Sequence, residues 1–311
     1  MVSIRVERPP APESVEVART LEAVAAAHDG HESLASFVWR DLAAPSAETS
    51  GIVATDGARP VGYAHLAPSD TDADPHLVAA FVRDPATADD AVVPALLEAL
   101  TAEARRREAR VVLWVNGVDD DVDALVTAAG FERLSEQLQM RVPLPLAEQP
   151  KWPDGVTVRT FVPGSDDAAW LRVNNLAFAT HRDQGGWVEA TLEARMAEPW
   201  FDPEDFLLAI DRNRLAGFCW TKVHAPAPGD AGPVGEIYVI GVDPDRQGTG
   251  LGRALTVGGL QHLATDRHCP TGMLYVDGAN PAALGLYRSL GFTTHHRDRA
   301  YQLGRTSGPT R

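Results

Sequence analysis

Short apolar runs alternate with longer stretches whose apolar residues recur at helical spacing, a pattern typical of strands and helices that share a core. In the first half, strands are predicted at residues 3–6, 51–55, 61–66, 77–82, 111–115 and 132–142, and helices at residues 15–27, 32–42, 91–109 and 121–129. In the second half, strands are predicted at residues 156–161, 205–210, 215–223, 236–242, 272–276 and 293–303, and helices at residues 166–178, 191–198, 252–263 and 281–290.

The order of predicted elements in the first half returns in the second half. Two short motifs repeat with it: Asp84-Pro85 matches Asp243-Pro244, and the Gly-Phe step at Gly130 matches the one at Gly291. Self-similarity on this scale indicates a duplicated domain. The chain is therefore expected to contain two similar domains.

A proline-rich stretch separates the two halves. Prolines at positions 143, 145, 150 and 153 oppose both helix and sheet, so residues 143–155 are predicted to be a linker. The expected organisation is a first domain at residues 1–142, a second domain at residues 156–305, and a disordered tail at residues 306–311.

Composition narrows the class of protein. The 311 residues are 44% hydrophobic, which is enough for a core in each domain, and the net charge is −15. Such an acidic balance argues against nucleic acid or an anionic membrane as a partner, and it tolerates a small amine substrate. We expect a monomer.

Cysteine usage and the apolar runs add two further expectations. Cys219 and Cys269 have neither metal-ligand spacing nor a disulfide framework, so no metal is expected. The start of the sequence does not read as a signal peptide, and no apolar run approaches the length of a membrane span. These features favour a cytoplasmic location.

The most informative stretch is the glycine-rich turn that follows the predicted strand at 236–242. It reads Asp243-Pro-Asp-Arg-Gln-Gly-Thr-Gly-Leu-Gly-Arg253 and leads into an apolar helix. Free backbone N–H groups and the helix dipole favour phosphate at such a turn. A glycine-rich turn without a ligand is the alternative. The spacing excludes a nucleotide P-loop and the dinucleotide fingerprint.

Gln247-x-x-Gly250-x-Gly252 resembles the pyrophosphate loop of the GCN5-related N-acetyltransferases, the GNAT family, whose co-substrate is acetyl-coenzyme A. The resemblance implies an α/β (α+β) fold of two tandem GNAT domains, each a mixed, mostly antiparallel sheet flanked by helices. It also implies that the end of the strand and the turn hold the cofactor: Ile240, Gly241, Val242, Gln247, Gly248, Thr249, Gly250, Leu251, Gly252 and Arg253.

The two halves are not equally equipped for this task. Aligned on Asp-Pro, the loop of the first half lacks the glycines and carries the carboxylates Asp89 and Asp90, which would oppose a pyrophosphate. We therefore expect the first half to have lost catalysis and most of its cofactor affinity.

Two residues of the second half suit acetyl transfer to an amine. Glu236 stands in an apolar strand and is the candidate general base, with a solvated carboxylate at the start of the strand as the alternative. Its side chain is expected to lie opposite those of Ile237, Val239 and Gly241. Tyr287 stands in Asn-Pro-Ala-Ala-Leu-Gly-Leu-Tyr, which resembles the second GNAT signature and implies a general acid; a packing tyrosine is the alternative.

The same signature implies further cofactor contacts from the start of this helix: Asn280, Pro281, Ala282, Ala283, Leu284 and Gly285. Longer stretches, among them Gly217-Phe-x-Trp-Thr-Lys-Val-His224, resemble the mycothiol synthase family. That resemblance implies acetylation of the cysteinyl amine of a cysteine–glucosamine–inositol precursor. It places acceptor contacts at Glu32, Asp183, Lys222, Glu236 and Tyr275.

Two alternative functions stay open on the residues alone. One is a GNAT enzyme that acetylates a protein N-terminus or another small amine. The other is an acetyl-coenzyme A-binding regulator without activity, which would be favoured by the loss of both catalytic candidates, and both are present.

Overall fold

The computed structural model describes residues 2–69, 75–87, 89–179, 186–226 and 230–303. These residues form two compact units. Unit 1 comprises residues 1–138, 277–279 and 295–311, and unit 2 comprises residues 139–276 and 280–294. The predicted tail at 306–311 lies outside the described residues.

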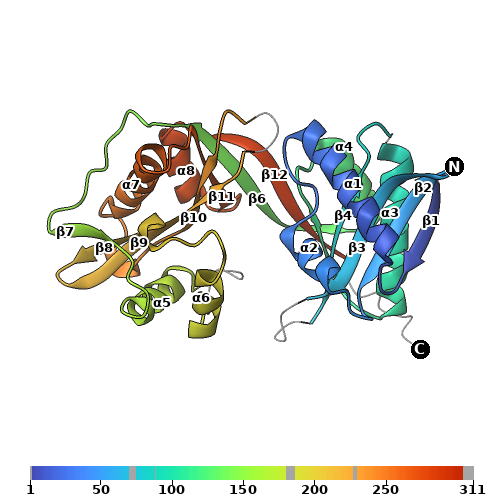
Figure 1. Cartoon of the computed structure of the whole chain (residues 1–311), viewed down its shortest axis with the longest axis horizontal. Helices are drawn as coiled ribbons and strands as arrows, with labels where there is room; N and C mark the ends of the chain where they lie inside the picture. Colours follow the sequence, from blue (N-terminus) through green and yellow to red (C-terminus); the bar gives the residue numbers. More distant parts are fainter. Residues whose placement is uncertain (1, 70–74, 88, 180–185, 227–229, 304–311) are drawn as a thin grey trace. The chain divides into compact units, whose positions relative to one another are not determined.

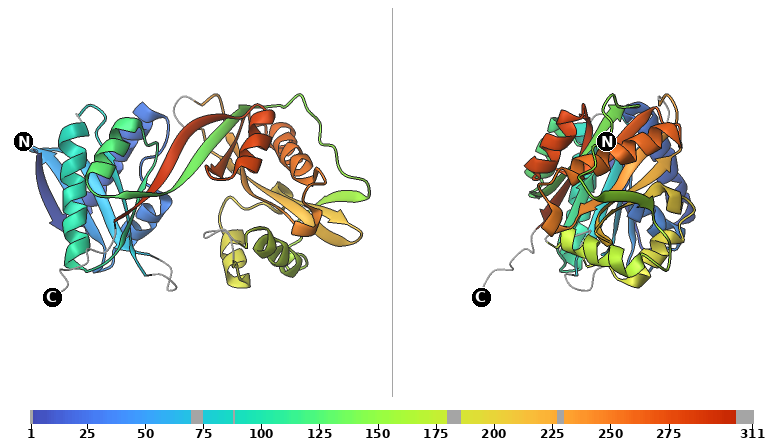
Figure 2. Two further views of the ribbon diagram at one scale, coloured as in Figure 1. Left: turned by 180° about the vertical axis from the view of Figure 1, so that it is seen from behind. Right: turned by 90° about the vertical axis from the view of Figure 1, so that its left-hand side faces the viewer.

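Unit 1 is a sheet covered by helices on both faces (Figure 1). The strands stand in the order β1-β2-β3-β4-β5-β12, in which β4 and β5 run parallel. Helices α1 and α2 cover one face, and α3 and α4 cover the other (Figure 2). The elements are β1 (Val2–Glu7), α1 (Pro12–Asp29), α2 (Ser36–Ala43), β2 (Ser50–Asp56), β3 (Arg59–Pro68), β4 (Leu77–Arg83), α3 (Asp89–Arg106), β5 (Val111–Val115), α4 (Asp120–Ala128) and β12 (Thr293–Leu303).

Unit 2 repeats this architecture. Its strands stand in the order β6-β11-β10-β9-β8-β7, with β10 and β11 parallel, and helices α5 and α7 pack on opposite faces. The elements are β6 (Glu132–Pro143), β7 (Val156–Thr160), α5 (Asp167–Ala177), α6 (Glu189–Met196), η1 (Pro203–Asp205), β8 (Phe206–Asp211), β9 (Arg214–His224), β10 (Val234–Val242), η2 (Pro244–Arg246), α7 (Leu251–Thr265), β11 (Thr271–Asp277) and α8 (Pro281–Ser289). The predicted fold class and the internal repeat are confirmed.

Burial on both faces explains why the strands read as continuous apolar runs rather than as alternating ones. In β2, for example, Ile52 and Ala54 belong to the core under α3 and α4, whereas Val53 belongs to the core under α1 and α2. Local turn chemistry then sets the register. Gly57 has φ +60° in the turn from β2 to β3, and Arg212 and Asn213 have positive φ between β8 and β9.

The last strand of each sequence half lies beside a strand of the other half. Residues 299–303 of β12 pair antiparallel with residues 111–115 of β5, and β6 lies next to β11. Tyr301 is fully buried in the core of unit 1, where its hydroxyl donates a hydrogen bond to Asp123 at 2.7 Å. In unit 2, Leu144 N donates to Pro270 O at 2.9 Å.

This exchange differs from the linear domain division expected from the sequence. A straight division at residue 142 leaves β5 with an unpaired edge, and an exposed edge of a buried apolar strand is unfavourable. The strand that fills that edge comes from residues 293–303 instead. The proline-rich segment also packs on unit 2. The Trp152 ring packs against Gly258 of α7, and Glu148 accepts a hydrogen bond from Arg253 of the same helix.

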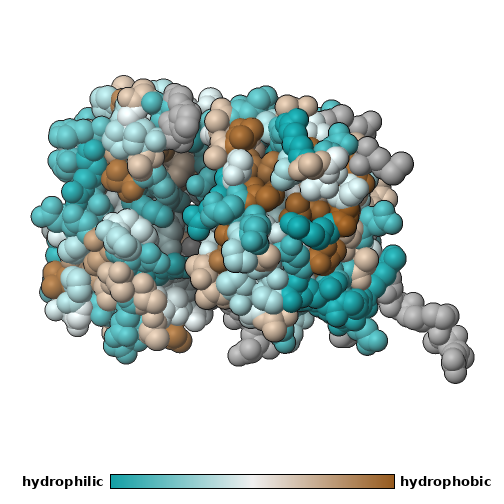
Figure 3. Space-filling model, turned by 45° about the vertical axis from the view of Figure 1, so that its right-hand side comes forward, coloured by the Kyte–Doolittle hydropathy of each residue, from teal (hydrophilic) through white to brown (hydrophobic). Residues whose placement is uncertain are grey.

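The surface carries both hydrophilic and hydrophobic residues. Hydrophilic residues cover most of the face seen in Figure 3, with hydrophobic residues between them. Within the part of the chain that the structure describes, no helix combines the length and apolar character that crossing a membrane requires.

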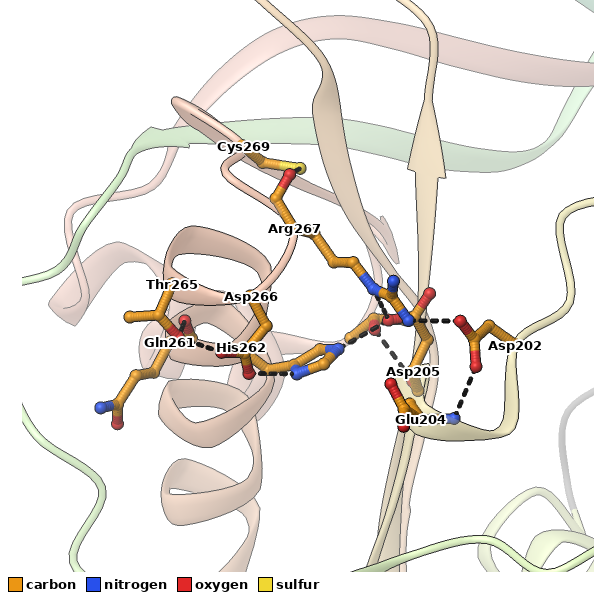
Figure 4. A network of polar contacts seen from close by, with 10 residues as sticks. Asp202, Glu204, Asp205, Gln261, His262, Thr265, Asp266, Arg267 and Cys269 are labelled. Atoms are coloured by element: carbon orange, nitrogen blue, oxygen red, sulfur yellow. Dashed lines mark hydrogen bonds and ion pairs between the residues drawn. The ribbon is translucent and has the colours of Figure 1, made fainter.

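A charged network anchors the C-terminal end of α7 to η1 (Figure 4). His262 lies between two carboxylates, with Nε2 2.6 Å from Asp205 Oδ1 and Nδ1 2.8 Å from Asp266 Oδ2. Arg267 adds hydrogen bonds to Asp205 and Asp202 at 2.6 and 2.5 Å. The network holds the helix whose other end begins at the glycine-rich turn.

Burial lowers the pKa of His262, but the hydrogen bonds and charges of Asp205 and Asp266 outweigh it and leave this pKa raised above its usual value. A histidine whose folded-state pKa is raised adds stability that is complete below the unfolded pKa, near 6.5, and is lost as the pH rises through the folded-state pKa.

We therefore expect His262→Gln to lower the free energy of unfolding by about 1–2 kcal/mol near pH 6, and by less near pH 9, because the lost hydrogen bonds are those of a charged group. Denaturant unfolding at both pH values measures this. His28→Gln is the control, since His28 forms an exposed pair with Asp29. An equal loss for His262→Gln at both pH values would contradict the assignment.

Candidate active site in the second unit

The glycine-rich turn forms an open cradle of backbone at the start of α7. Gly248 and Gly250 have φ +75° and +85°, and a Cβ at either position would meet no atom within 4 Å. The first intrahelical bond of α7 runs from Ala254 N to Gly250 O, so the N–H groups of residues 251–253 have no partner inside the helix. Open space and free donors at a helix N-terminus suit a phosphate.

Arginines compensate the carboxylates around this turn. Asp243 caps η2 by accepting a hydrogen bond from Asp245 N, and its other carboxylate oxygen accepts a hydrogen bond from the Arg172 guanidinium at 3.1 Å. Arg246 pairs with Asp211. Arg253 donates to both oxygens of Glu148, at 2.8 and 2.6 Å, so the part of Arg253 that faces a ligand is its backbone N–H.

Strand β10 leaves its parallel neighbour halfway along its length. Val234–Ile237 pair with β11, and beyond Ile237 the described register with β11 ends, while β10 stays paired with β9 as far as Val242. A β-bulge lies at this point, because Ile237 pairs with Thr221 and Val239 pairs with the next residue, Trp220. Tyr238 is the extra residue. Because the described register with β11 ends at Ile237, the backbone edge of Ile240, Gly241 and Val242 suits an extended ligand chain.

The bulge reverses the alternation of side chains along β10. Added Cβ atoms on Gly235 and Gly241 would meet α7 and α5 respectively, although positions six apart on a regular strand share a face. Val239 packs in the core on the α5 side. The expectation that Val239 and Gly241 lie opposite Glu236 is therefore wrong, because the extra residue moves both to the face of Glu236; Ile237 lies opposite it.

Glu236 is 7% exposed and makes a short contact with its neighbouring strand. Its Oε2 lies 2.6 Å from Nε2 of His224, a residue of β9. Lys222 is the direct cross-strand partner of Glu236, and its Nζ lies 4.8 Å from the centre of the Trp200 ring. Glu236 and Lys222 are thus neighbours in the structure. His224 shares the face of Lys222, because it stands two residues further along the strand.

Tyr287 lies on α8 with its ring packed against Phe292, and it is 7% exposed. Burial, with a smaller effect from the Cys219 thiol, raises the pKa of Tyr287 to about 12. The hydroxyl therefore keeps its proton throughout the neutral range, so it is present as a donor.

The predicted cofactor contacts on α8 surround the start of the helix. Asn280 is its N-cap, and its side-chain oxygen accepts from Ala283 N at 3.1 Å. Pro281 is the first helical residue, where a missing N–H costs nothing. Gly285 has open space where a Cβ would stand. This helix start therefore leaves space for a ligand, while Leu284 is buried as a core residue.

Tyr275 shares the face of Glu236, because Met273 pairs with Glu236 in β11 and Tyr275 follows two residues later. It is 42% exposed, and its hydroxyl accepts from Gln139 Nε2 at 2.8 Å. Gln139 in turn accepts from Arg141, which pairs with Asp230 at 2.9 Å. The sequence reasoning missed this polar row, since β6 is assigned by sequence to the other half.

Two predicted acceptor residues stand apart from this set. Asp183 lies outside the described residues. Glu32 is exposed in unit 1, where its carbonyl accepts from Asn116 Nδ2 at 3.3 Å. Of the predicted acceptor residues, the structure places Glu236, Lys222 and Tyr275 on one face of the sheet of unit 2.

Unit 1 has the same fold as unit 2, but its residues at the corresponding site differ. The turn carboxylate Asp84 accepts from Ala86 N at 2.9 Å and pairs with Arg59, as Asp243 does with its own turn and arginine. Strand β4, however, pairs with β3 without a bulge from Leu77 to Arg83. A cavity of about 180 Å³ remains between the ends of β4 and β5, and the His31 ring occupies the place of a Cβ on Gly117.

The chain is similar in sequence and in fold to known acetyltransferases. Residues 170–292 match the acetyltransferase (GNAT) family. Mycothiol acetyltransferase of Streptomyces coelicolor is 41% identical over 94% of this chain and 92% of its own, and that of Thermomonospora curvata is 51% identical over 67% of each chain. Two solved structures share the fold. A GCN5-related N-acetyltransferase from Sphaerobacter thermophilus has a TM-score of 0.69 at 24% identity and covers 96% of this chain and 95% of its own. A tandem GNAT protein of the clavulanic acid biosynthesis pathway has a TM-score of 0.71 at 18% identity over both full chains.

The loop, the bulged strand and the buried Glu236 and Tyr287 lie inside or at the edges of the region that the family match covers. The relatives extend the likeness to nearly the whole chain, including unit 1. The chain belongs to the mycothiol acetyltransferase family, a family of acetyltransferases with the GNAT fold.

Proposed function

We propose that unit 2 transfers the acetyl group of acetyl-coenzyme A to the cysteinyl amine of a cysteine–glucosamine–inositol precursor, in mycothiol biosynthesis. The observation that carries the proposal is the edge of β10 beyond Ile237, where its pairing with β11 has ended, directly before the glycine cradle at Gly248 and Gly250. The relatives named mycothiol acetyltransferase support the choice of acceptor.

The donor is held by backbone on this proposal. The N–H groups of residues 248–253 donate to the pyrophosphate, and the open edge at 240–242 binds the amide-bearing arm as an added strand. The start of α8 at Asn280 contacts the same arm. Side chains contribute little charge here, because the nearby arginines are already paired with carboxylates.

Glu236 and Tyr287 divide the proton transfers between them. Glu236 takes a proton from the ammonium group, and the free amine attacks the thioester carbonyl. As the carbon–sulfur bond breaks, Tyr287 gives its proton to the leaving thiolate. Because its pKa is raised, Tyr287 still carries that proton near neutral pH when the transfer begins.

The acceptor lies against the polar face of unit 2. Lys222 donates to hydroxyl groups, and Glu236 and Tyr275 accept from them, which suits a sugar-like substrate. Asp183 and Glu32 stay proposals from the family resemblance alone. We also keep as predictions a monomer, a cytoplasmic location, and the absence of metal and of a nucleic acid partner.

Unit 1 is proposed to be a structural partner with little or no catalysis. Strand β4 lacks the bulge, and the His31 ring fills part of the space between the ends of β4 and β5. Burial, and then the charge of His296, lower the pKa of His31, so this ring adds no cation for a pyrophosphate near neutral pH.

The function is tested by measuring thiol release from acetyl-coenzyme A with the cysteine–glucosamine–inositol amine, beside a panel of peptide and aminoglycoside amines. We expect rapid release with the first amine only. Release with a different amine would replace the acceptor and keep the mechanism. Cofactor binding without release from any amine would favour the regulator.

Glu236→Gln and Tyr287→Phe are expected to lower kcat by about 100-fold each, since general acid–base catalysis contributes about that factor or more. Both changes keep the shape of the side chain, so cofactor affinity should stay near that of the parent protein. Steady-state kinetics and a direct binding measurement separate the two effects. Unchanged kcat in both variants would refute the assigned roles.

Gly250→Asp is expected to weaken acetyl-coenzyme A binding at least tenfold, because a carboxylate near the pyrophosphate adds repulsion of about 1–4 kcal/mol. Gly164→Asp is a matched control: Gly164 also has positive φ and open space around its Cβ, but it lies in the turn before α5. Equal affinities in the two variants would contradict a phosphate site at the turn.

A further inference from the structure

We propose that His224 is a proton relay that carries to solvent the proton which Glu236 takes from the acceptor amine. The inference rests on the proposed function, because it needs Glu236 as the base. It assigns a second residue to the proton path without placing that residue against the substrate. His224 thus acts through Glu236 and does not contact the reacting atoms itself.

The contact between the two side chains is short and direct. His224 Nε2 lies 2.6 Å from Glu236 Oε2, across the β9–β10 pair. Exposure differs sharply between them: the Glu236 side chain is 10% exposed and the His224 side chain is 34% exposed. A proton taken up by the buried carboxylate therefore has a neighbour that reaches both the carboxylate and water.

The other ionisable groups described around Glu236 are poorly suited to accept that proton. Lys222, its cross-strand partner, is an ammonium group that lies over the Trp200 ring and has no acceptor atom. Tyr238 lies on the same strand, and its pKa is raised. Burial is the largest cause; the charge of Arg195 lowers this pKa, and the charges of Glu236 and Glu198 raise it, so the phenol keeps its own proton. On β11, Tyr275 is also a phenol, and its hydroxyl accepts from Gln139.

The proton balance requires such a path. The ammonium substrate and the thioester yield an amide, a thiol and one proton, which leaves for solvent. That proton moves from the substrate nitrogen to Glu236 and then to Nε2 of His224 in its Nδ1–H form, while Nδ1–H releases a proton to water. Each turnover thus returns Glu236 to the carboxylate and leaves the imidazole with its proton on Nε2. Exchange of the ring protons with water restores the Nδ1–H form before the next turnover, without any further reactant.

Two substitutions separate relay from positioning. Gln in His224→Gln can still donate a hydrogen bond to Glu236 but cannot carry a proton. His224→Ala opens space beside Glu236 from the solvent side. On the proposal, both lower kcat by about tenfold or more while the KM for the amine stays within about twofold, and imidazole added to the buffer restores kcat of His224→Ala with rising concentration.

The control is His262→Gln, which removes another histidine that lies 2.6 Å from a carboxylate in the same unit, away from Glu236. It should keep kcat and show no response to imidazole. Thermal unfolding of each variant checks that the fold is kept.

The relay is overturned if His224→Gln keeps the parent kcat, or if His224→Ala is slow and imidazole leaves it slow; the second result assigns His224 to positioning of Glu236 alone. These assays use whichever amine the parent protein acetylates. Failure of the relay is therefore distinct from failure of the proposed acceptor, which shows in the parent protein itself.

Discussion

One extra residue in one strand decides which side chains share a face with the candidate base. Tyr238 forms a bulge where the pairing of β10 with β11 ends, and β10 stays paired with β9 on its other side. An open backbone edge then leads directly into the glycine turn and α7. The same residue reverses the alternation of faces, so Glu236 and Gly241 share the α5 side of the sheet. The bulge thus brings the carboxylate to the same face as residues of the ligand edge.

Unit 1 has the same fold without a bulge in the corresponding strand. Both units have the same order of elements, a parallel strand pair, and an aspartate that caps the turn after the fourth strand. In unit 1 the strand is regular, and a histidine ring packs onto Gly117. In both units the parallel pairing ends before the strand does, at Ala80 and at Ile237, whereas the glycine cradle and the bulge belong to unit 2.

Much of the fold could be predicted from the sequence, because local rules act at each step. Buried strands such as Val111–Val115 read as apolar runs, Asp56-Gly57 marks a hairpin, and the glycine spacing around Gly250 marks the cradle. The bulge left no such signal, since one inserted residue in an apolar strand keeps its composition. The His224–Glu236 contact and the Tyr275–Gln139 bond depend on strand neighbours, which a single sequence does not specify.

The exchange of terminal strands changes what the duplication means for the chain. Tyr301 fills the core of unit 1 and closes the edge of β5, although nearly all of unit 2 precedes it in the sequence. During synthesis, unit 1 therefore waits for its last strand until unit 2 has already emerged. Each copy therefore needs a strand from the other sequence half to complete its sheet. A recombination event that cuts between the halves would leave each copy without that strand. The duplication is visible in the sequence, but it can no longer be separated there.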